Sequence, residues 1–345
     1  MEIGGLTRRV VVREQSDAGE VRHLSLQAAE SARFDALLTT RVSIIASEMT
    51  SNLMKHSANG GEILINALAA PTGPGVVELV ATDRGPGIAN PAAAMEDGYS
   101  TTGSLGSGLG AIRRHSSYFD IYSMANRGTA VLARVSADGL SAGHREFDFG
   151  VISVPKDGEE VSGDGWAVAD IPCGIQLLVV DGLGHGLLAA DAANLAVKTF
   201  RTTAGQQPIE VLRALHPPMR ATRGATVGVV TLDIQGRVVT YGGVGNIGAA
   251  IVTPDRHSWL VSLNGTIGRE PVQFKQFEAE WDPTAVLIAH SDGLSTRWRL
   301  DQPGLAAKDP TLIAAVLFRD FARQLDDVTV VVAKERSRQP ESPGR

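Results

Sequence analysis

The sequence contains one cysteine, Cys173, so no internal disulfide can form. A chain without disulfides fits a reducing compartment. Its 32 Lys and Arg against 38 Asp and Glu give a net charge of -6, and therefore no general basic field for nucleic acid or an anionic membrane. Apolar runs such as "IQLLVV" are too short to cross a bilayer, and "MEIGGLTRRVVVREQ" does not resemble a signal peptide. We therefore expect a cytoplasmic protein that binds neither nucleic acid nor membrane.

The composition is that of a globular chain, and its 345 residues are enough for two domains. Over residues 8–135, strand and helix patterns alternate, which predicts an α/β sandwich with helices on one face of a mostly antiparallel sheet. Beyond a polar, aperiodic stretch come many short apolar strands, with helical patterns only near 187–205 and 310–324; this favours a two-sheet core flanked by helices. The predicted units are a domain at 1–136, a linker at 137–148, a second domain at 149–334 and a disordered tail at 335–345.

Three polar residues recur along the predicted helix at 41–57. Glu48, Asn52 and His56 are spaced at i, i+4 and i+8, so they share one face of that helix. For any single trio of this kind, a solvated helix face is the simpler interpretation. A chemical role needs partners elsewhere in the chain.

Two glycine-containing segments follow this helix. Asp83 ends the apolar run "VVELVATD" and begins an Asp-x-Gly-Pro-Gly segment, which turn chemistry alone would explain. Further on, "GSLGSGLG" places Gly103, Gly106, Gly108 and Gly110 just before a helix. Such a run lets backbone amides approach a phosphate chain, although a flexible loop is the alternative. The segment does not match the P-loop pattern.

The order of these three motifs resembles the GHKL ATP-binding superfamily, and within it the small RsbT-like anti-sigma-factor serine kinases. The resemblance covers nearly all of residues 8–135 and implies a Bergerat-type α/β sandwich that uses ATP and Mg²⁺. It implies that Asp83 accepts a hydrogen bond from the adenine amino group, that Asn52 holds Mg²⁺, and that Glu48 is the general base. The other residues implied to line the nucleotide are Gly85, Gly87, Gly103, Ser104, Leu105, Gly106, Gly108, Leu109, Gly110 and Thr129.

In the second half, carboxylates stand where apolar strands begin or end. They are Asp164, Asp181, Asp292 and the pair Asp326 and Asp327. Hard divalent cations bind carboxylate oxygens, and a two-metal site needs several of them. Each aspartate alone is better explained as a turn residue, but the repeated placement at strand ends favours a metal site.

These motifs resemble the PPM-type metal-dependent serine/threonine phosphatases of the SpoIIE/RsbX branch, from about residue 148 to 334. "VVDGLGHG" is close to the Asp-x-x-Gly-His-Gly signature of that branch, and "SDG" and "DDVT" match its later motifs. The resemblance implies an αββα β-sandwich with two Mn²⁺ or Mg²⁺ ions that activate the attacking water. The implied ligands are Asp164, Asp181, the Gly182 carbonyl, Asp292 and Asp326. Asp327 competes with Asp326, and His185 can be structural or catalytic. The segment around Asp164 departs from the usual Gly-Gly-Asp, which leaves metal affinity and rate open.

Together the resemblances imply a bifunctional signalling enzyme. Its first half would phosphorylate a serine or threonine of a STAS-domain protein, of the anti-sigma-antagonist or stressosome type, and its second half would dephosphorylate such a residue. One alternative is that the first half is an ATP-binding anti-sigma or adaptor module without kinase activity. Another is that the second half is a degenerate phosphatase fold that serves as a sensor.

Overall fold

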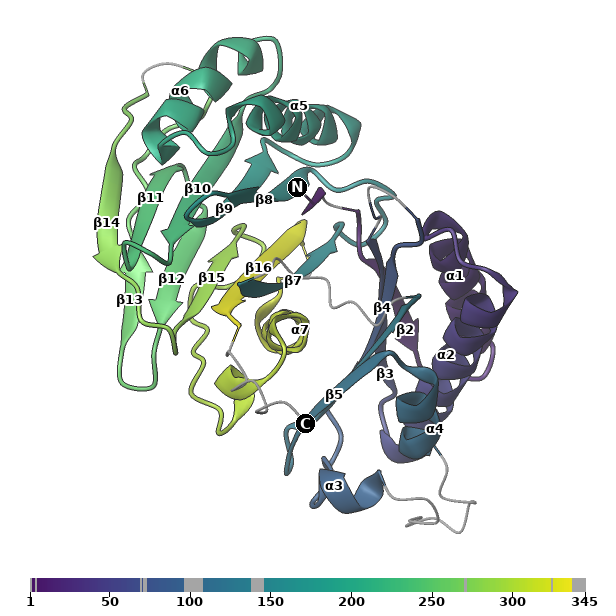
Figure 1. Ribbon diagram of the computed structural model, residues 1–345. Coiled ribbons are helices and arrows are strands. Elements are labelled where there is room, and N and C mark those ends of the chain that lie inside the picture. Colours follow the sequence, from purple (N-terminus) through teal and green to yellow (C-terminus); the bar gives the residue numbers. More distant parts are fainter. Residues whose placement is uncertain are drawn as a thin grey trace.

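The computed structural model describes residues 2–3, 5–68, 70, 73–95, 108–137, 146–269, 272–323 and 325–336. Within these ranges the chain forms three antiparallel sheets and their covering helices (Figure 1). The first half contributes one sheet and the second half a pair of stacked sheets. Both predicted fold classes, an α/β sandwich and an αββα sandwich, are confirmed.

The first-half sheet has the strand order β2-β3-β4-β6-β5. Its strands are β2 (Arg8–Val12), β3 (Gly61–Leu68), β4 (Val76–Asp83), β5 (Tyr118–Met124) and β6 (Gly128–Ser136). The helices of this half are α1 (Asp17–Ser31), α2 (Ala36–His56), α3 (Pro91–Ala94) and α4 (Gly108–His115). Asp35 caps α2 by accepting a hydrogen bond from the Leu38 amide at 2.8 Å. The apolar stripe that includes Ile45 and Met49 buries this helix against the sheet, which fixes the direction of its polar face.

The second half stacks a six-stranded sheet on a five-stranded one. The first has the order β1-β8-β9-β10-β11-β14, with β1 (Glu2–Ile3), β8 (Asp164–Ile171), β9 (Gly174–Gly182), β10 (Ala225–Asp233), β11 (Val238–Val244) and β14 (Gln276–Glu280). The second has the order β13-β12-β15-β16-β7, with β13 (His257–Leu260), β12 (Gly248–Val252), β15 (Val286–His290), β16 (Val328–Glu335) and β7 (Phe147–Val154). Buried side chains of both sheets, among them Phe147, Trp166 and Leu177, fill the space between them.

Helices cover both outer faces of this sandwich. The helices α5 (Leu187–Thr203) and α6 (Pro208–Met219) pack on the six-stranded sheet. The short 3-10 helix at Leu305–Ala307 and α7 (Pro310–Phe321) pack on the five-stranded sheet. Sequence patterns predicted α5 and α7. They missed α6, whose last turn contains Pro217 and Pro218.

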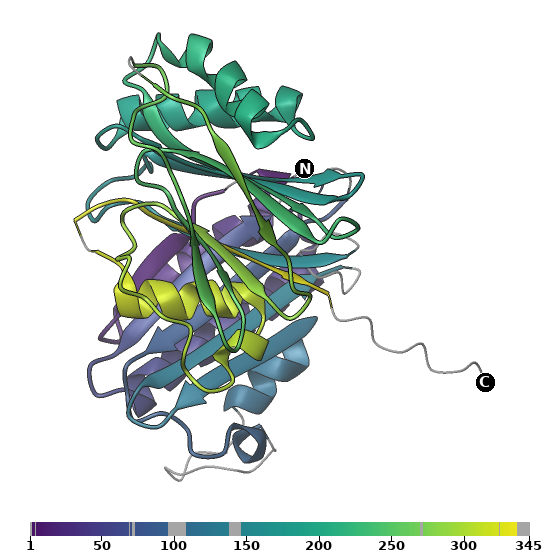
Figure 2. The same cartoon turned by 90° about the vertical axis from the view of Figure 1, so that its left-hand side faces the viewer.

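Helix α7 lies between the two halves (Figures 1 and 2). One side of α7 packs on β7 and β16, and the other reaches the open face of the first-half sheet, where one buried cluster joins Val80 and Leu132 to Ile313 and Leu317. In the first-half sheet, α1, α2 and α4 occupy the opposite face. The helix is therefore a shared layer of both halves.

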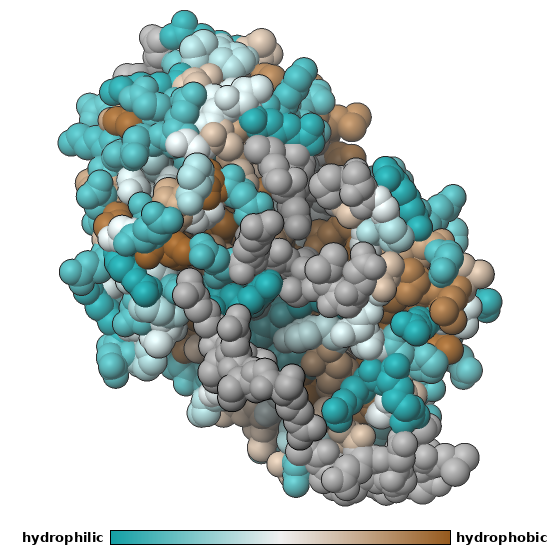
Figure 3. Space-filling view, in the orientation of Figure 1, coloured by the Kyte–Doolittle hydropathy of each residue, from teal (hydrophilic) through white to brown (hydrophobic). Residues whose placement is uncertain are grey.

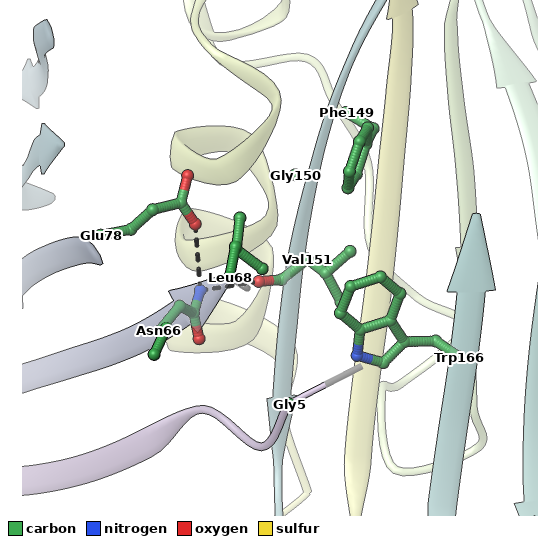
Figure 4. Close-up of a pocket in the computed structure, with 9 residues that line it drawn as sticks. Gly5, Asn66, Leu68, Glu78, Phe149, Gly150, Val151 and Trp166 are labelled. Carbon is green, nitrogen blue, oxygen red and sulfur yellow. Dashed lines mark hydrogen bonds between the residues drawn. The ribbon is translucent and has the colours of Figure 1, made fainter. Parts of the chain in front are cut away.

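A buried ionic network fixes the start of α7 against the first half. Arg134 of β6 donates to Asp309, the N-cap residue of α7, at 2.6 and 2.7 Å, and to Glu78 of β4 at 2.5 Å. Asn66 of β3 donates to Glu78 at 3.2 Å and to the Val151 carbonyl of β7 at 3.1 Å, beside a small cavity between the halves (Figure 4). Opposite charges thus pair where water is excluded.

The positions of β1, β7 and β16 can be compared with the predicted domain boundaries. Strand β1 pairs with β8 although it belongs to residues 1–136, so the extreme N-terminus joins a second-half sheet. The predicted linker 137–148 falls mostly on 138–145, outside the described residues, and its last two residues begin β7. The predicted tail 335–345 begins on the last residue of β16, and its residues 337–345 are outside the described part.

The surface in the view of Figure 1 is mainly hydrophilic, with small hydrophobic patches, one of them over the region of α1 and α2 (Figure 3). None of the helices within the described residues has both the length and the apolar character needed to cross a bilayer.

Candidate nucleotide and metal sites

The candidate nucleotide site is built along the last turns of α2. Glu48 and Asn52 are half-buried on successive turns of this helix. A Cβ added to Gly108 would lie 2.7 Å from Asn52 Oδ1, so the first residue of α4 packs against the Asn52 amide. A Cβ added to Gly85 would lie 3.3 Å from the His56 carbonyl, so the turn after Asp83 packs against the end of α2. The structure therefore brings Asn52, Gly108 and the Asp83 turn together.

The rest of the predicted lining is placed by the adjoining strands and α4. Gly87 has φ +75°, and a Cβ there would lie 2.3 Å from the Met124 carbonyl, so only glycine fits this turn. Thr129 is buried, with its hydroxyl 2.9 Å from that of Ser123. Leu109 and Gly110 lie in the first turn of α4. Gly103, Ser104, Leu105 and Gly106 lie outside the described residues, so their roles stay predictions.

Asp83 is a partly desolvated acceptor. Burial raises the pKa of its carboxyl group, while the backbone amides of Gly85 and Thr129 and the charge of Arg319 lower it. The Gly85 amide donates to Asp83 Oδ1 at 2.7 Å, which fixes the carboxylate at the strand end. A fixed acceptor of this kind fits an amino group on a planar base.

The candidate metal site lies where strand ends of the two stacked sheets meet. Asp164 begins β8 and stands directly opposite Asp181 of β9 in the antiparallel ladder. Asp292 lies just beyond β15, and Asp326 lies just before β16. Since β15 and β16 are antiparallel neighbours, the end of β15 and the start of β16 lie side by side at the same end of the sheet.

Ser291 ties the two sheets together at this point. Its hydroxyl donates to Asp164 Oδ2 at 2.6 Å and accepts from the Thr329 amide at 2.9 Å. On the same side, the Asn246 amide donates to Asp292 Oδ2. Sequence reasoning missed Ser291 and Asn246 because no spacing rule connects them to the carboxylates that they hold.

The carboxylates at this edge repel one another. The pKa of Asp181 rises to about 7, first through burial and then through the charges of Asp292, Asp326 and Asp327. Burial and the charge of Asp181 raise the pKa of Asp164. No three ligand side chains of the described part already surround one common ion position. Even so, several partly buried carboxylates lie at the same strand ends. Divalent cations prefer such carboxylate oxygens, so these residues fit the implied metal ions.

The adjacent Asp326 and Asp327 occupy different environments. Asp327 is buried, and its two oxygens accept from the Lys156 and Gly163 amides, each at 2.8 Å. Asp326 is exposed, and its charge adds to the effect of burial in raising the pKa of Asp292. This arrangement supports Asp326 as the ligand and gives Asp327 a structural task.

The glycine-rich turn after Asp181 places α5 close to the site. A Cβ added to Gly182 would lie 2.3 Å from the Ala189 carbonyl, so the turn requires glycine at that position. His185 Nδ1 lies 2.7 Å from Glu159 Oε1 at an exposed position, so the histidine has a partner in the fold, and both alternatives for its role stay predictions.

Comparison with known proteins gives separate relatives for the two halves of the chain. The family model of the histidine kinase-like ATPase domain matches residues 12–135. The serine/threonine-protein kinase RsbT of Bacillus subtilis (strain 168) is 33% identical over 117 residues, which cover 34% of this chain and 86% of that protein. The first half of the chain belongs to the RsbT kinase family. The second half carries different relatives.

Residues 173–336, which follow the RsbT-like half, match the family model of stage II sporulation protein E, SpoIIE. The phosphoserine phosphatase RsbX of B. subtilis (strain 168) is 25% identical over 146 residues, which cover 42% of this chain and 73% of that protein. A solved structure from work on the bacterial stressosome, "a modular system that has been adapted to control secondary messenger signaling", has a TM-score of 0.52 and 25% identity and covers 55% of this chain and 100% of its own. The chain is thus a fusion of an RsbT-like kinase domain with a SpoIIE-type phosphatase domain.

Proposed function

We propose that the chain is a bifunctional partner-switching enzyme. Its RsbT-like half transfers the γ-phosphoryl group of ATP to a serine or threonine of a STAS-domain protein. Its SpoIIE-type half removes phosphate from such a residue. The observation that carries the proposal is the convergence of Asp164 and Asp181 from one sheet with Asp292 and Asp326 from the other. The STAS-type partners and a cytoplasmic location stay predictions.

In the kinase half, the residues around α2 divide the work. Asp83 accepts a hydrogen bond from the adenine amino group, and Asn52 holds the Mg²⁺ that accompanies the triphosphate. Glu48 lies one helical turn before Asn52 and receives the proton of the attacking hydroxyl. The new O–P bond forms as the bond between the β- and γ-phosphates breaks, and ADP leaves.

In the phosphatase half, the chain supplies carboxylates rather than a nucleophile. Two Mn²⁺ or Mg²⁺ ions, when bound, supply positive charge for the phosphoryl oxygens and activate water. The residues that would hold them are Asp164, Asp181, Asp292, Asp326 and, through its carbonyl, Gly182. Ser291 keeps the Asp164 carboxylate oriented, and Asn246 does the same for Asp292.

Transfer from labelled ATP to a STAS-domain protein tests the kinase assignment. An Asp181→Asn background prevents loss of the label through the phosphatase half. We expect transfer in that background, loss of transfer when Glu48→Ala is added, and retention with Glu20→Ala, an exposed glutamate of α1. Equal transfer with and without Glu48 would remove its role as the base.

The same experiment distinguishes the adaptor alternative. An adaptor module would bind ATP without transfer by any variant. The position of Glu48 on the same face as Asn52 favours the kinase, since a module that only senses ATP needs no base. For the second half, manganese-dependent hydrolysis of an aryl phosphate that Asp181→Ala abolishes would exclude a degenerate sensor.

A further inference from the structure

The end of α7 touches the strand that carries Asp83. Arg319 of α7 donates from Nη1 to the Asp83 carbonyl at 3.0 Å, and Arg84 donates in return to the Arg319 carbonyl. The Arg319 side chain is only 4% exposed. A reciprocal pair of hydrogen bonds therefore crosses between the halves next to the proposed adenine acceptor.

Arg319 is held in one orientation. Its Nε and Nη2 donate to the two oxygens of Asp320 at 2.8 and 3.0 Å. This two-point pairing fixes the plane of the guanidinium group and leaves Nη1 directed at Asp83. A buried charge in fixed geometry loses little side-chain freedom when it holds its target.

Other features of this boundary are already accounted for. The network around Arg134 has internal partners for its charges, and it lies at the opposite end of α7, so it has no contact with the Asp83 turn. The open cleft beside Phe318 is lined by Arg84, Arg319 and Asp326, and so lies on the boundary between the two halves. Within the described residues, the contact of Arg319 with Asp83 is therefore the feature of α7 that most directly concerns the nucleotide.

We propose that Arg319, a residue of the phosphatase half, is a positioning residue of the nucleotide site. It fixes the main chain at Asp83 so that the carboxylate meets the adenine amino group. The kinase site is in this sense completed by the second half. The inference rests on the proposed role of Asp83 as the adenine acceptor.

A pair of nucleotides isolates this role. ATP carries an amino group that can donate to Asp83, whereas inosine triphosphate carries a carbonyl at that position and cannot. If Arg319 acts through Asp83, its loss weakens ATP binding much more than binding of inosine triphosphate. A general loosening of the fold would weaken both equally.

The experiment measures the dissociation constants of both nucleotides for the full chain by calorimetry. We expect wild type to prefer ATP, Arg319→Ala to lower ATP affinity about tenfold with little change for inosine triphosphate, and Arg319→Lys to restore part of the preference. Thr311→Val is the matched control. It removes a hydroxyl that bonds Glu78 and Arg134 across the same boundary, far from Asp83, and we expect it to keep the preference.

The outcomes separate two failures. If wild type binds neither nucleotide, or binds both equally, the proposed role of Asp83 is wrong. If wild type prefers ATP and Arg319→Ala keeps that preference, the role of Arg319 is overturned. The inference also fails if Thr311→Val lowers the preference as much as Arg319→Ala does. If the alanine variant does not fold, Arg319→Lys should prefer ATP less than wild type does, because Lys cannot reproduce the two-point pairing with Asp320, and a preference equal to that of wild type would overturn the role of Arg319.

Discussion

Asp164 and Asp181 stand directly opposite each other on the paired strands β8 and β9, and burial together with the charge of Asp181 raises the pKa of Asp164. Opposed like charges destabilise a sheet unless a cation lies between or beside them. Ser291 nevertheless holds Asp164 in place from the second sheet. The fold thus holds these two carboxyl groups close together although their charges repel each other. Three predictions follow from this repulsion.

Replacing Asp181 should separate activity from stability. We expect Asp181→Asn to lower manganese-dependent hydrolysis of an aryl phosphate about 100-fold or more, because a proposed metal ligand is lost. The same change should raise the melting temperature of the metal-free protein at about pH 8, because a carboxylate that is costly to ionise is removed. Asp255→Asn, in an exposed turn, is the control for both measurements. A lower melting temperature in Asp181→Asn would contradict the electrostatic argument.

The metal-free protein should lose stability as the pH rises. The folded-state pKa of Asp181, about 7, lies above its ordinary value of 3.8, so the folded chain keeps a proton that the unfolded chain has released. The contribution of Asp181 to the free energy of unfolding therefore falls between about pH 4 and about pH 7. Bound Mn²⁺ requires the ionised carboxylate, so stabilisation by saturating MnCl₂ should be larger at about pH 8 than at about pH 5. Melting curves at both values check this; equal shifts would count against it.

The two adjacent aspartates should behave differently when they are changed. Asp326→Asn is expected to weaken Mn²⁺ binding and phosphatase activity without lowering the metal-free melting temperature, because it removes a charge that repels Asp181 and Asp292. Asp327→Asn loses a carboxylate oxygen that accepts from a backbone amide, so we expect it to destabilise the metal-free fold by about 1–3 kcal/mol. Urea unfolding and Mn²⁺ titration of both variants test the assignment. The reverse pattern would make Asp327 the ligand.

Much of the fold could be predicted because hydrophobic periodicity is local. The alternation of strands and helices indicated both sandwiches, and the strand-end aspartates indicated a shared edge. Helix α6 was missed because Pro217 and Pro218 read as a break, whereas the helix continues through both to Met219. The pairing of β1 with β8 was missed because two residues carry no usable pattern.

The contacts between the halves could not be predicted from the sequence. Glu78, Arg134 and Asp309 are far apart in the chain, and each alone looks like an ordinary charge on a strand or at a helix start. Arg319 likewise belongs to no motif. Only the docking of α7 against the first-half sheet brings these groups together, and docking depends on the whole apolar surface rather than on any short segment.

The buried network at the start of α7 should be important for stability. Arg134→Ala leaves Glu78 and Asp309 buried without their cation, so we expect a loss of about 3–5 kcal/mol in the free energy of unfolding. Arg213→Ala removes a surface ion pair with Glu210 and should cost less than about 1 kcal/mol. Urea unfolding compares the two variants. A similar small loss in both would show that the network contributes little.

Nucleotide and metal binding should be coupled through the end of α7. The segment that begins with Arg319 continues to Arg323, whose amide donates to the Gly293 carbonyl at 2.7 Å, next to Asp292. A nucleotide that orders Asp83 should therefore also order the segment that contacts Gly293, beside the proposed metal site. We expect ADP to tighten Mn²⁺ binding about fivefold. By linkage, Mn²⁺ must tighten ADP binding by the same factor.

Titration of Mn²⁺ with and without ADP, and of ADP with and without Mn²⁺, measures this coupling. Arg319→Ala should bring both factors to about one, because it removes the hydrogen bond to Asp83 from the connecting segment. Thr311→Val should preserve them, since it alters the other end of α7. If ADP leaves Mn²⁺ affinity unchanged in wild type, the two halves share a boundary without sharing a regulatory link. A coupling that survives in Arg319→Ala would place the link in another part of that boundary.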